Sequence, residues 1–202
     1  MLYGLSMGLE AAVGFWLITV MTRTGFDSAV ASASNVAFYM LFAVSRLVFT
    51  PCLCHRLRPR PTTVIMGGAS IALLCCVPAT LWPRWLPAVL LAVAGIPLGL
   101  GPVQPMTISL LKSQGEMTNV HTGMLSISCT VGSGAGPFLM SQVLQAFGLE
   151  TFFRAFTATL LLLLLLPAMM LGRHCAAAKI RASGALLVCD LWKAAIAVDR
   201  LL

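Results

Sequence analysis

Apolar residues fill six long stretches of the chain, and short segments rich in charged residues, proline or glycine separate them. The stretches cover residues 2–22, 36–54, 62–82, 86–111, 120–147 and 151–172. Crossing about 30 Å of hydrocarbon takes roughly 20 apolar residues in a helix, so each stretch is long enough. Helices are expected because lipid offers no hydrogen-bond partner to free backbone groups. The pattern therefore predicts an all-α membrane protein with six transmembrane helices forming one bundle.

Composition and charge agree with a membrane protein. The chain is 59% hydrophobic and 9% charged, whereas soluble domains carry about 25% charged residues. In a soluble protein, the net charge of +7 would suggest binding to nucleic acid. Here the basic residues gather at the ends of the spans. We therefore expect the partner to be a lipid bilayer and not nucleic acid. The side predicted to be cytoplasmic carries Arg56, Arg58, Arg60, Lys112, Arg173, Lys179 and Arg181, and the opposite side carries Arg23, Arg84 and Arg154. By the positive-inside bias, both termini are expected in the cytoplasm.

The two ends of the chain differ in character. The first span has no basic leader and no small-residue cleavage pattern, so we expect it to be retained rather than removed as a signal peptide. Residues 1–172 are expected to form the six-span bundle, and residues 173–202 a cytoplasmic tail. Within the tail, residues 183–202 have the pattern of an amphipathic helix at the membrane interface, although a poorly ordered tail is the alternative.

Two charged residues lie inside predicted spans. Placing a charge at bilayer depth costs about 2.5–3.5 kcal/mol on insertion scales, so such residues are candidates for function. Glu10 is in the first span and Arg46 is midway along the second, and pairing would offset part of both costs. The alternatives are a carboxylate that reaches the headgroups and an arginine that ties neighbouring helix ends together.

The fourth and fifth spans carry further polar and helix-breaking residues. The fourth contains "GIPLGLGPVQPMTISL", where prolines and glycines interrupt the backbone ladder and Gln104 and Thr107 lie one turn apart. Interrupted membrane helices are typical of segments that line a cavity or bend. The fifth has a polar row of Thr122, Ser126 and Thr130 and a GxxxG motif that ends at Gly136. The alternative is structural, because membrane Ser and Thr often bond their own helix and GxxxG motifs serve packing.

Several of these motifs resemble one family of transporters. The segments "YGLSMGLEAAVGFWLITVMTRTG" and "VAFYMLFAVSRLVFTPCLCHRLRPRP" resemble the start of the C-terminal half of a major facilitator superfamily transporter, of the fucose:proton symporter and sodium-dependent glucose transporter-like type. "GLGPVQPMTISLL" and "GMLSISCTVGSGAGPFL" are similar to the tenth and eleventh helices of that fold. The resemblance covers residues 1 to about 172. The acidic residue of the family's loop motif is missing, since Cys54 and His55 occupy its region.

The resemblance implies a secondary active transporter, or its C-terminal half, that moves a small polar solute such as a sugar by alternating access. A second six-span half, or a second copy of this chain, would complete the cavity. Glu10 would contact the solute or carry a proton, and the other expected solute contacts are Trp16, Asn35, Gln104 and Thr107. The positions expected to serve gating or structure are Arg46, Arg56, Arg58, Arg60, Pro97, Gly136 and Pro137.

Other functional classes are less well supported by the sequence. A membrane hydrolase could be built from His121 with Ser126 or Ser133, but there is no GxSG motif and the spacing does not put His121 and Ser126 cleanly on one face. We expect no enzymatic activity, no metal and no cofactor, and no nucleotide-binding loop is present. The alternative to a transporter is a membrane subunit that does not transport, or a truncated fragment without independent activity.

Overall fold

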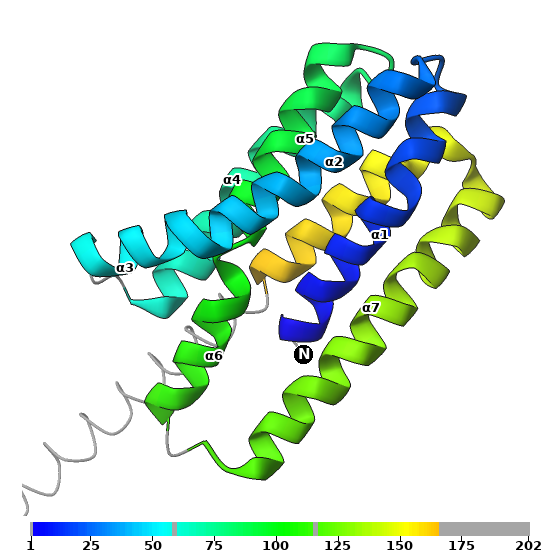
Figure 1. The fold of residues 1–202 in the computed structure, drawn as a ribbon. Coiled ribbons are helices and arrows are strands. Elements are labelled where there is room, and N and C mark those ends of the chain that lie inside the picture. Colours follow the sequence, from blue (N-terminus) through cyan, green and yellow to red (C-terminus); the bar gives the residue numbers. More distant parts are fainter. Residues whose placement is uncertain (1, 58–59, 115–116, 166–202) are drawn as a thin grey trace, which may run out of the picture. The chain divides into compact units, whose positions relative to one another are not determined.

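The computed structural model describes residues 2–57, 60–114 and 117–165, and within these ranges the chain forms six helices and no strand. Three helices run without a break: α1 (Leu2–Arg23), α4 (Pro61–Leu81) and α7 (Asn119–Phe147). Two are interrupted, because α2 (Ser28–Val44) passes through a π-helical turn, η1 (Ser45–Phe49), into α3 (Thr50–Leu57), and α5 (Leu86–Leu100) is followed after two residues by α6 (Val103–Gln114). A 3-10 turn, η2 (Leu149–Thr151), leads into a last helix that is described over residues 152–165 (Figure 1).

Four helices in the described ranges are long and apolar enough to cross a membrane, which agrees with an integral multi-pass membrane protein. They cover Tyr3–Arg23, Ser28–Cys52, Pro61–Leu81 and Leu86–Lys112. They match the first four predicted spans, and α7 is not among them although it has 29 residues. The described residues up to Leu165 belong to one compact unit. The rest of the predicted sixth span and the predicted tail helix lie outside the described residues.

The predicted start of the second span was wrong. The sequence predicts a loop up to residue 35, but α2 begins at Ser28, directly after Asp27 in an extended conformation. The turn before it is short: Gly25 has a φ of +102°, which glycine adopts without steric cost, and the Phe26 N–H bonds the Met21 carbonyl at 3.1 Å. Residues 28–35 are mostly alanine, serine and valine. Residues 28–35 are only weakly apolar, so the apolar pattern did not include them in the span. They nevertheless form the first two turns of α2.

Glycines bring α1 and α7 into backbone contact. On α1, Gly4 and Gly8 face Gly132 and Gly136 of α7, and a Cβ added at Gly8 would lie 2.9 Å from the Gly132 carbonyl oxygen. Small residues spaced by four let membrane helices approach in this way. The predicted GxxxG contact of α7 is therefore present, and its partner is a second GxxxG motif on α1. Figure 1 shows α1 and α7 as neighbouring helices.

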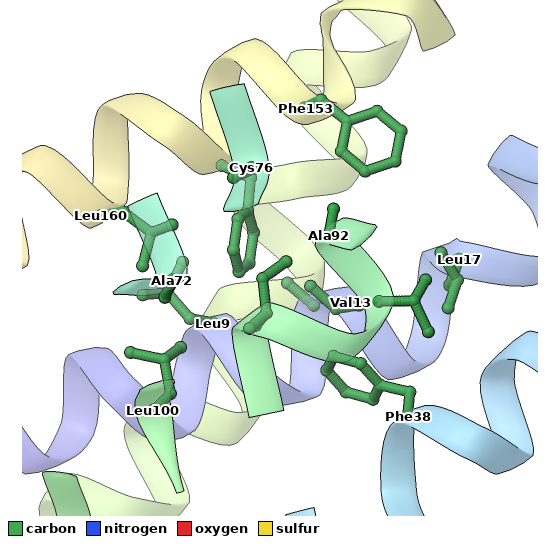
Figure 2. Packing of buried hydrophobic residues seen from close by; sticks show 14 of the residues in the cluster. Leu9, Val13, Leu17, Phe38, Ala72, Cys76, Ala92, Leu100, Phe153 and Leu160 are labelled. Atoms are coloured by element: carbon green, nitrogen blue, oxygen red, sulfur yellow. The ribbon is translucent and has the colours of Figure 1, made fainter. Parts of the chain in front are cut away.

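The apolar core is built from inward-facing residues of several helices. Leu9, Val13 and Leu17 follow one face of α1 at intervals of four and are almost fully buried, as expected for helical periodicity. Figure 2 shows these side chains close to residues of four other helical segments, the labelled ones being Phe38, Ala72, Cys76, Ala92, Leu100, Phe153 and Leu160. This core holds α1 against the rest of the bundle and so fixes the position of Glu10.

Candidate functional site

The two charged residues that the sequence places inside spans form an ion pair. Arg46 donates from Nη2 to Glu10 Oε2, so the predicted pairing is confirmed. The side chain of Glu10 is 12% exposed and that of Arg46 is 31% exposed. The guanidinium also lies over the Phe42 ring, 4.8 Å from its centroid, where the face of the ring attracts a cation.

A third polar side chain joins the pair from another helix. Gln104, in the first turn of α6, donates from Nε2 to the same oxygen, Glu10 Oε2, at 3.1 Å, and it also contacts the sulfur of Met7. Gln104 itself is buried. We call Glu10, Arg46 and Gln104 the polar cluster. It joins α1, η1 and α6, and its carboxylate accepts two bonds from donors on separate segments.

Local sequence explains why each member of the polar cluster can reach the others. Glu10 lies on α1 between Gly8 and Gly14, whose missing side chains let the α7 backbone and the Tyr39 hydroxyl pack against α1. Arg46 lies in a π-helical turn, and such turns occur frequently at functional sites. Gln104 is the second residue of α6 and lies two residues after Pro102, where the helix restarts after its break.

Tyr39 is a neighbour of the polar cluster that the sequence analysis missed. Its hydroxyl lies against Gly14 of α1, in the space that a Cβ would fill. The phenol is within electrostatic reach of Glu10. Tyr39 lies one turn after Asn35 on α2, so the two side chains share a face. The signal was available, because Asn35, Tyr39, Phe42 and Arg46 follow one another at helical spacing.

Two buried polar side-chain atoms on α2 and η1 have no hydrogen-bond partner within the described part of the chain. They are Asn35 Oδ1 and Arg46 Nε. Most buried polar groups in proteins are paired, so unpaired ones require an explanation. Both belong to the face of α2 and η1 that carries Tyr39, and both atoms are buried.

The remaining predicted solute contacts are not part of the polar cluster. Trp16 donates from Nε1 to the Pro137 carbonyl of α7 at 3.0 Å. Thr107 donates to Val103 in its own helix at 2.7 Å, which is the structural alternative noted above for membrane threonines. These two bonds therefore serve helix packing and helix continuity in this structure.

The predicted gating positions are spread over the bundle. Pro97 is buried inside α5, and its carbonyl accepts a bond from the Gly101 N–H at 2.8 Å. Gly136 lies against Gly8 of α1. Arg56 and Arg60 are exposed beside the connection between α3 and α4. Arg58 lies outside the described residues.

The residues considered for a hydrolase have other roles. His121 Nδ1 lies 3.3 Å from the Thr118 N–H and 3.0 Å from the Thr118 hydroxyl, so it belongs to the capping box of α7. Ser133 donates to the Thr130 carbonyl at 3.2 Å. In the described ranges, no group of three or more His, Cys, Asp or Glu side chains is arranged to hold a metal ion.

Comparison of the sequence with known protein families finds no match, and a search of curated proteins finds no significant match.

Proposed function

We propose that this chain is a secondary transporter, or the C-terminal half of one, that moves a small polar solute across a membrane. The observation that carries the proposal is the polar cluster, in which a carboxylate, a guanidinium and an amide from three helical segments meet inside a membrane bundle. Ionisable residues within membrane spans are costly and commonly mark the paths of substrates and ions.

The charge balance of the polar cluster favours a neutral solute. Glu10 and Arg46 neutralise each other, so an ion entering the site would leave one of the two charges without its partner. A neutral hydroxylated molecule leaves the pair intact, and one of its hydroxyls could bond the unpaired Arg46 Nε atom. The Tyr39 ring beside Glu10 offers an apolar face of the kind that a sugar ring can contact. A sugar is therefore the favoured solute, in line with the family resemblance.

Interrupted helices support a mechanism of alternating access. Arg46 lies in the π-helical turn between α2 and α3, and Gln104 follows the break between α5 and α6. Discontinuous helices carry the binding residues in many secondary transporters, where one bundle moves against another around the site. In this proposal the second bundle is another six-span half or a second copy of the chain.

Solute counterflow into proteoliposomes tests the proposal. The purified chain is reconstituted in vesicles preloaded with an unlabelled neutral monosaccharide or polyol. Entry of the same labelled solute is then followed for L-fucose, D-glucose and mannitol. We expect saturable counterflow of at least one sugar, lost in Gln104→Ala and retained in Ser34→Ala, a buried serine that bonds its own helix. Equal leakage from vesicles with and without protein, for every solute, would favour a subunit or fragment that does not transport alone.

A further inference from the structure

The interruptions of the two broken helices meet at one residue, Ser45. This serine is fully buried and begins the π-helical turn η1. Its hydroxyl donates to the Leu98 carbonyl oxygen of α5 at 3.3 Å. A Cβ added at Gly101 would collide with the Ser45 side chain, so the glycine at the break is what lets Ser45 approach.

The bond from Ser45 replaces one that proline removes. In a regular helix the Leu98 carbonyl would accept a bond from the N–H of residue 102, but residue 102 is proline and has no N–H. An unpaired carbonyl is expensive within a membrane, and serine or threonine side chains of a neighbouring helix can satisfy it. Ser45 does this for the break between α5 and α6.

The same residue also anchors the π-helical turn. The Ser45 carbonyl accepts both the Thr50 N–H and the Thr50 hydroxyl, the latter at 2.8 Å. Pro51 follows directly, and its ring would crowd the carbonyl of Leu47 in a regular α-helix. A wider turn at this point relieves that crowding. Ser45 therefore bonds to both interruptions, through its carbonyl to one and through its hydroxyl to the other.

The polar cluster sits directly beside this junction. Arg46 is the next residue after Ser45, and Gln104 is three residues after Gly101. We propose that Ser45 is a positioning residue that couples the Glu10–Arg46 pair to the bend between α5 and α6. A solute or a proton that loosens Arg46 from Glu10 shifts η1, and the Ser45 hydroxyl transmits the shift to Leu98. The role of the solute rests on the proposed function, whereas the coupling itself does not.

The bend can be measured in the full chain without any solute. Spin-label amino acids replace Leu90 on α5 and Lys112 on α6, both of which are exposed, and the protein is placed in lipid nanodiscs. A straight helix would separate the two positions by roughly 33 Å, which suits pulsed electron-spin distance measurements. Glu10→Gln removes the charge that holds Arg46 and stands in for loosening of the pair.

We expect Glu10→Gln to shift the distance distribution in the wild-type background and to leave it unchanged in the Ser45→Ala background. The matched control is Ser34→Ala, because Ser34 of α2 is likewise a buried serine but donates to Val30 of its own helix. The shift should persist in that background. A shift of equal size in the Ser45→Ala and Ser34→Ala backgrounds, or no shift in the wild-type background, would overturn the coupling.

A second background covers the case in which Ser45→Ala does not fold. Pro102→Ala restores an N–H that can bond the Leu98 carbonyl, so the Ser45 bond is no longer needed. The shift caused by Glu10→Gln should be lost there too, and a full-size shift would contradict the proposal. These distance measurements require no transport. If the coupling is found without sugar counterflow, only the proposed function is contradicted. If counterflow is found without the coupling, only this inference is contradicted.

Discussion

Glu10 of α1 and Arg46 of η1 are paired inside the bundle, and Gln104 of α6 bonds the same carboxylate oxygen. Each of the three side chains comes from a different helical segment. The pair therefore joins α1 to η1, and Gln104 extends the connection to the restarted helix α6.

Removing one partner of this pair should destabilise the protein more than removing both. Breaking a buried pair costs about 3–5 kcal/mol because it leaves one charge uncompensated, and the 31% exposure of Arg46 reduces this figure. We expect Glu10→Gln and Arg46→Gln each to lower the free energy of unfolding, and the double variant to recover part of the loss. Unfolding of the four proteins in mixed micelles, followed by circular dichroism, measures the coupling.

The pair between Arg84 and Glu150 is the matched control for that cycle. Its atoms are 3.0 Å apart, but the side chains are 77% and 62% exposed. Exposed pairs contribute about 0–1 kcal/mol, so Glu150→Gln should change stability little. An equal loss of stability in Glu150→Gln and Glu10→Gln would contradict the placement of Glu10 and Arg46 in the interior.

The crossing of α1 and α7 should tolerate no side chain at Gly132. A Cβ there would collide with the Gly4 carbonyl, whereas a Cβ at Gly134 of the same helix would meet nothing within 4 Å. We expect Gly132→Ala to destabilise the protein by about 1–3 kcal/mol through overpacking. Gly134→Ala should be neutral or stabilising by up to about 1 kcal/mol, because alanine is the better helix former. Similar unfolding curves for the two variants would show that the helices do not cross at these glycines.

The Trp16 indole should contribute to the same interface through its bond to Pro137. Trp16→Phe keeps the aromatic ring but removes the donor, so we expect a loss of about 0.5–1.5 kcal/mol. Trp85→Phe is the control, since Trp85 is exposed in the turn between α4 and α5. Unfolding of both variants is compared with that of the wild-type chain, and equal changes would remove the assigned role of the Trp16 bond.

The distribution of basic residues predicts which end of α4 faces the cytoplasm. This helix has 21 residues and is about 31 Å long, which matches the hydrocarbon thickness. The test uses a chain whose seven native cysteines are replaced by alanine. In intact cells, Arg84→Cys should react with an impermeant maleimide added outside. Arg60→Cys should react only after the cells are permeabilised. The reverse labelling pattern would contradict the predicted orientation.

The sequence predicts much of the fold because burial in lipid requires long apolar runs. The first four spans are found as helices, and the pairing of Glu10 with Arg46 follows from the cost of a lone charge. The start of α2 was missed because residues 28–35 are small and weakly apolar, and apolar pattern alone does not separate such a run from a loop. The beginning of a helix there depends on the turn at Gly25.

Side-chain partners across helices were harder to predict. The sequence did not reveal that the Trp16 indole bonds the Pro137 carbonyl, because the partner of a side chain depends on which helix packs beside it. Thr107 bonds a carbonyl of its own helix, as membrane threonines often do. From the sequence, this bond was only the alternative to a solute contact. Tyr39 reaches Gly14 only because α1 and α2 pack closely, and periodicity within one helix does not reveal the register between two.

The most direct test of the central claim is binding of a neutral sugar to the polar cluster. The unfolding temperature of the purified chain in nanodiscs is measured with increasing L-fucose or D-glucose, because a ligand that binds the folded state raises it with concentration. We predict a saturable rise for the wild-type chain and for Ser34→Ala, and at least a tenfold weaker response for Gln104→Ala and Glu10→Gln. A response of equal strength in all four proteins, or none in any, would contradict the assignment of Glu10, Arg46 and Gln104 as the solute-binding site.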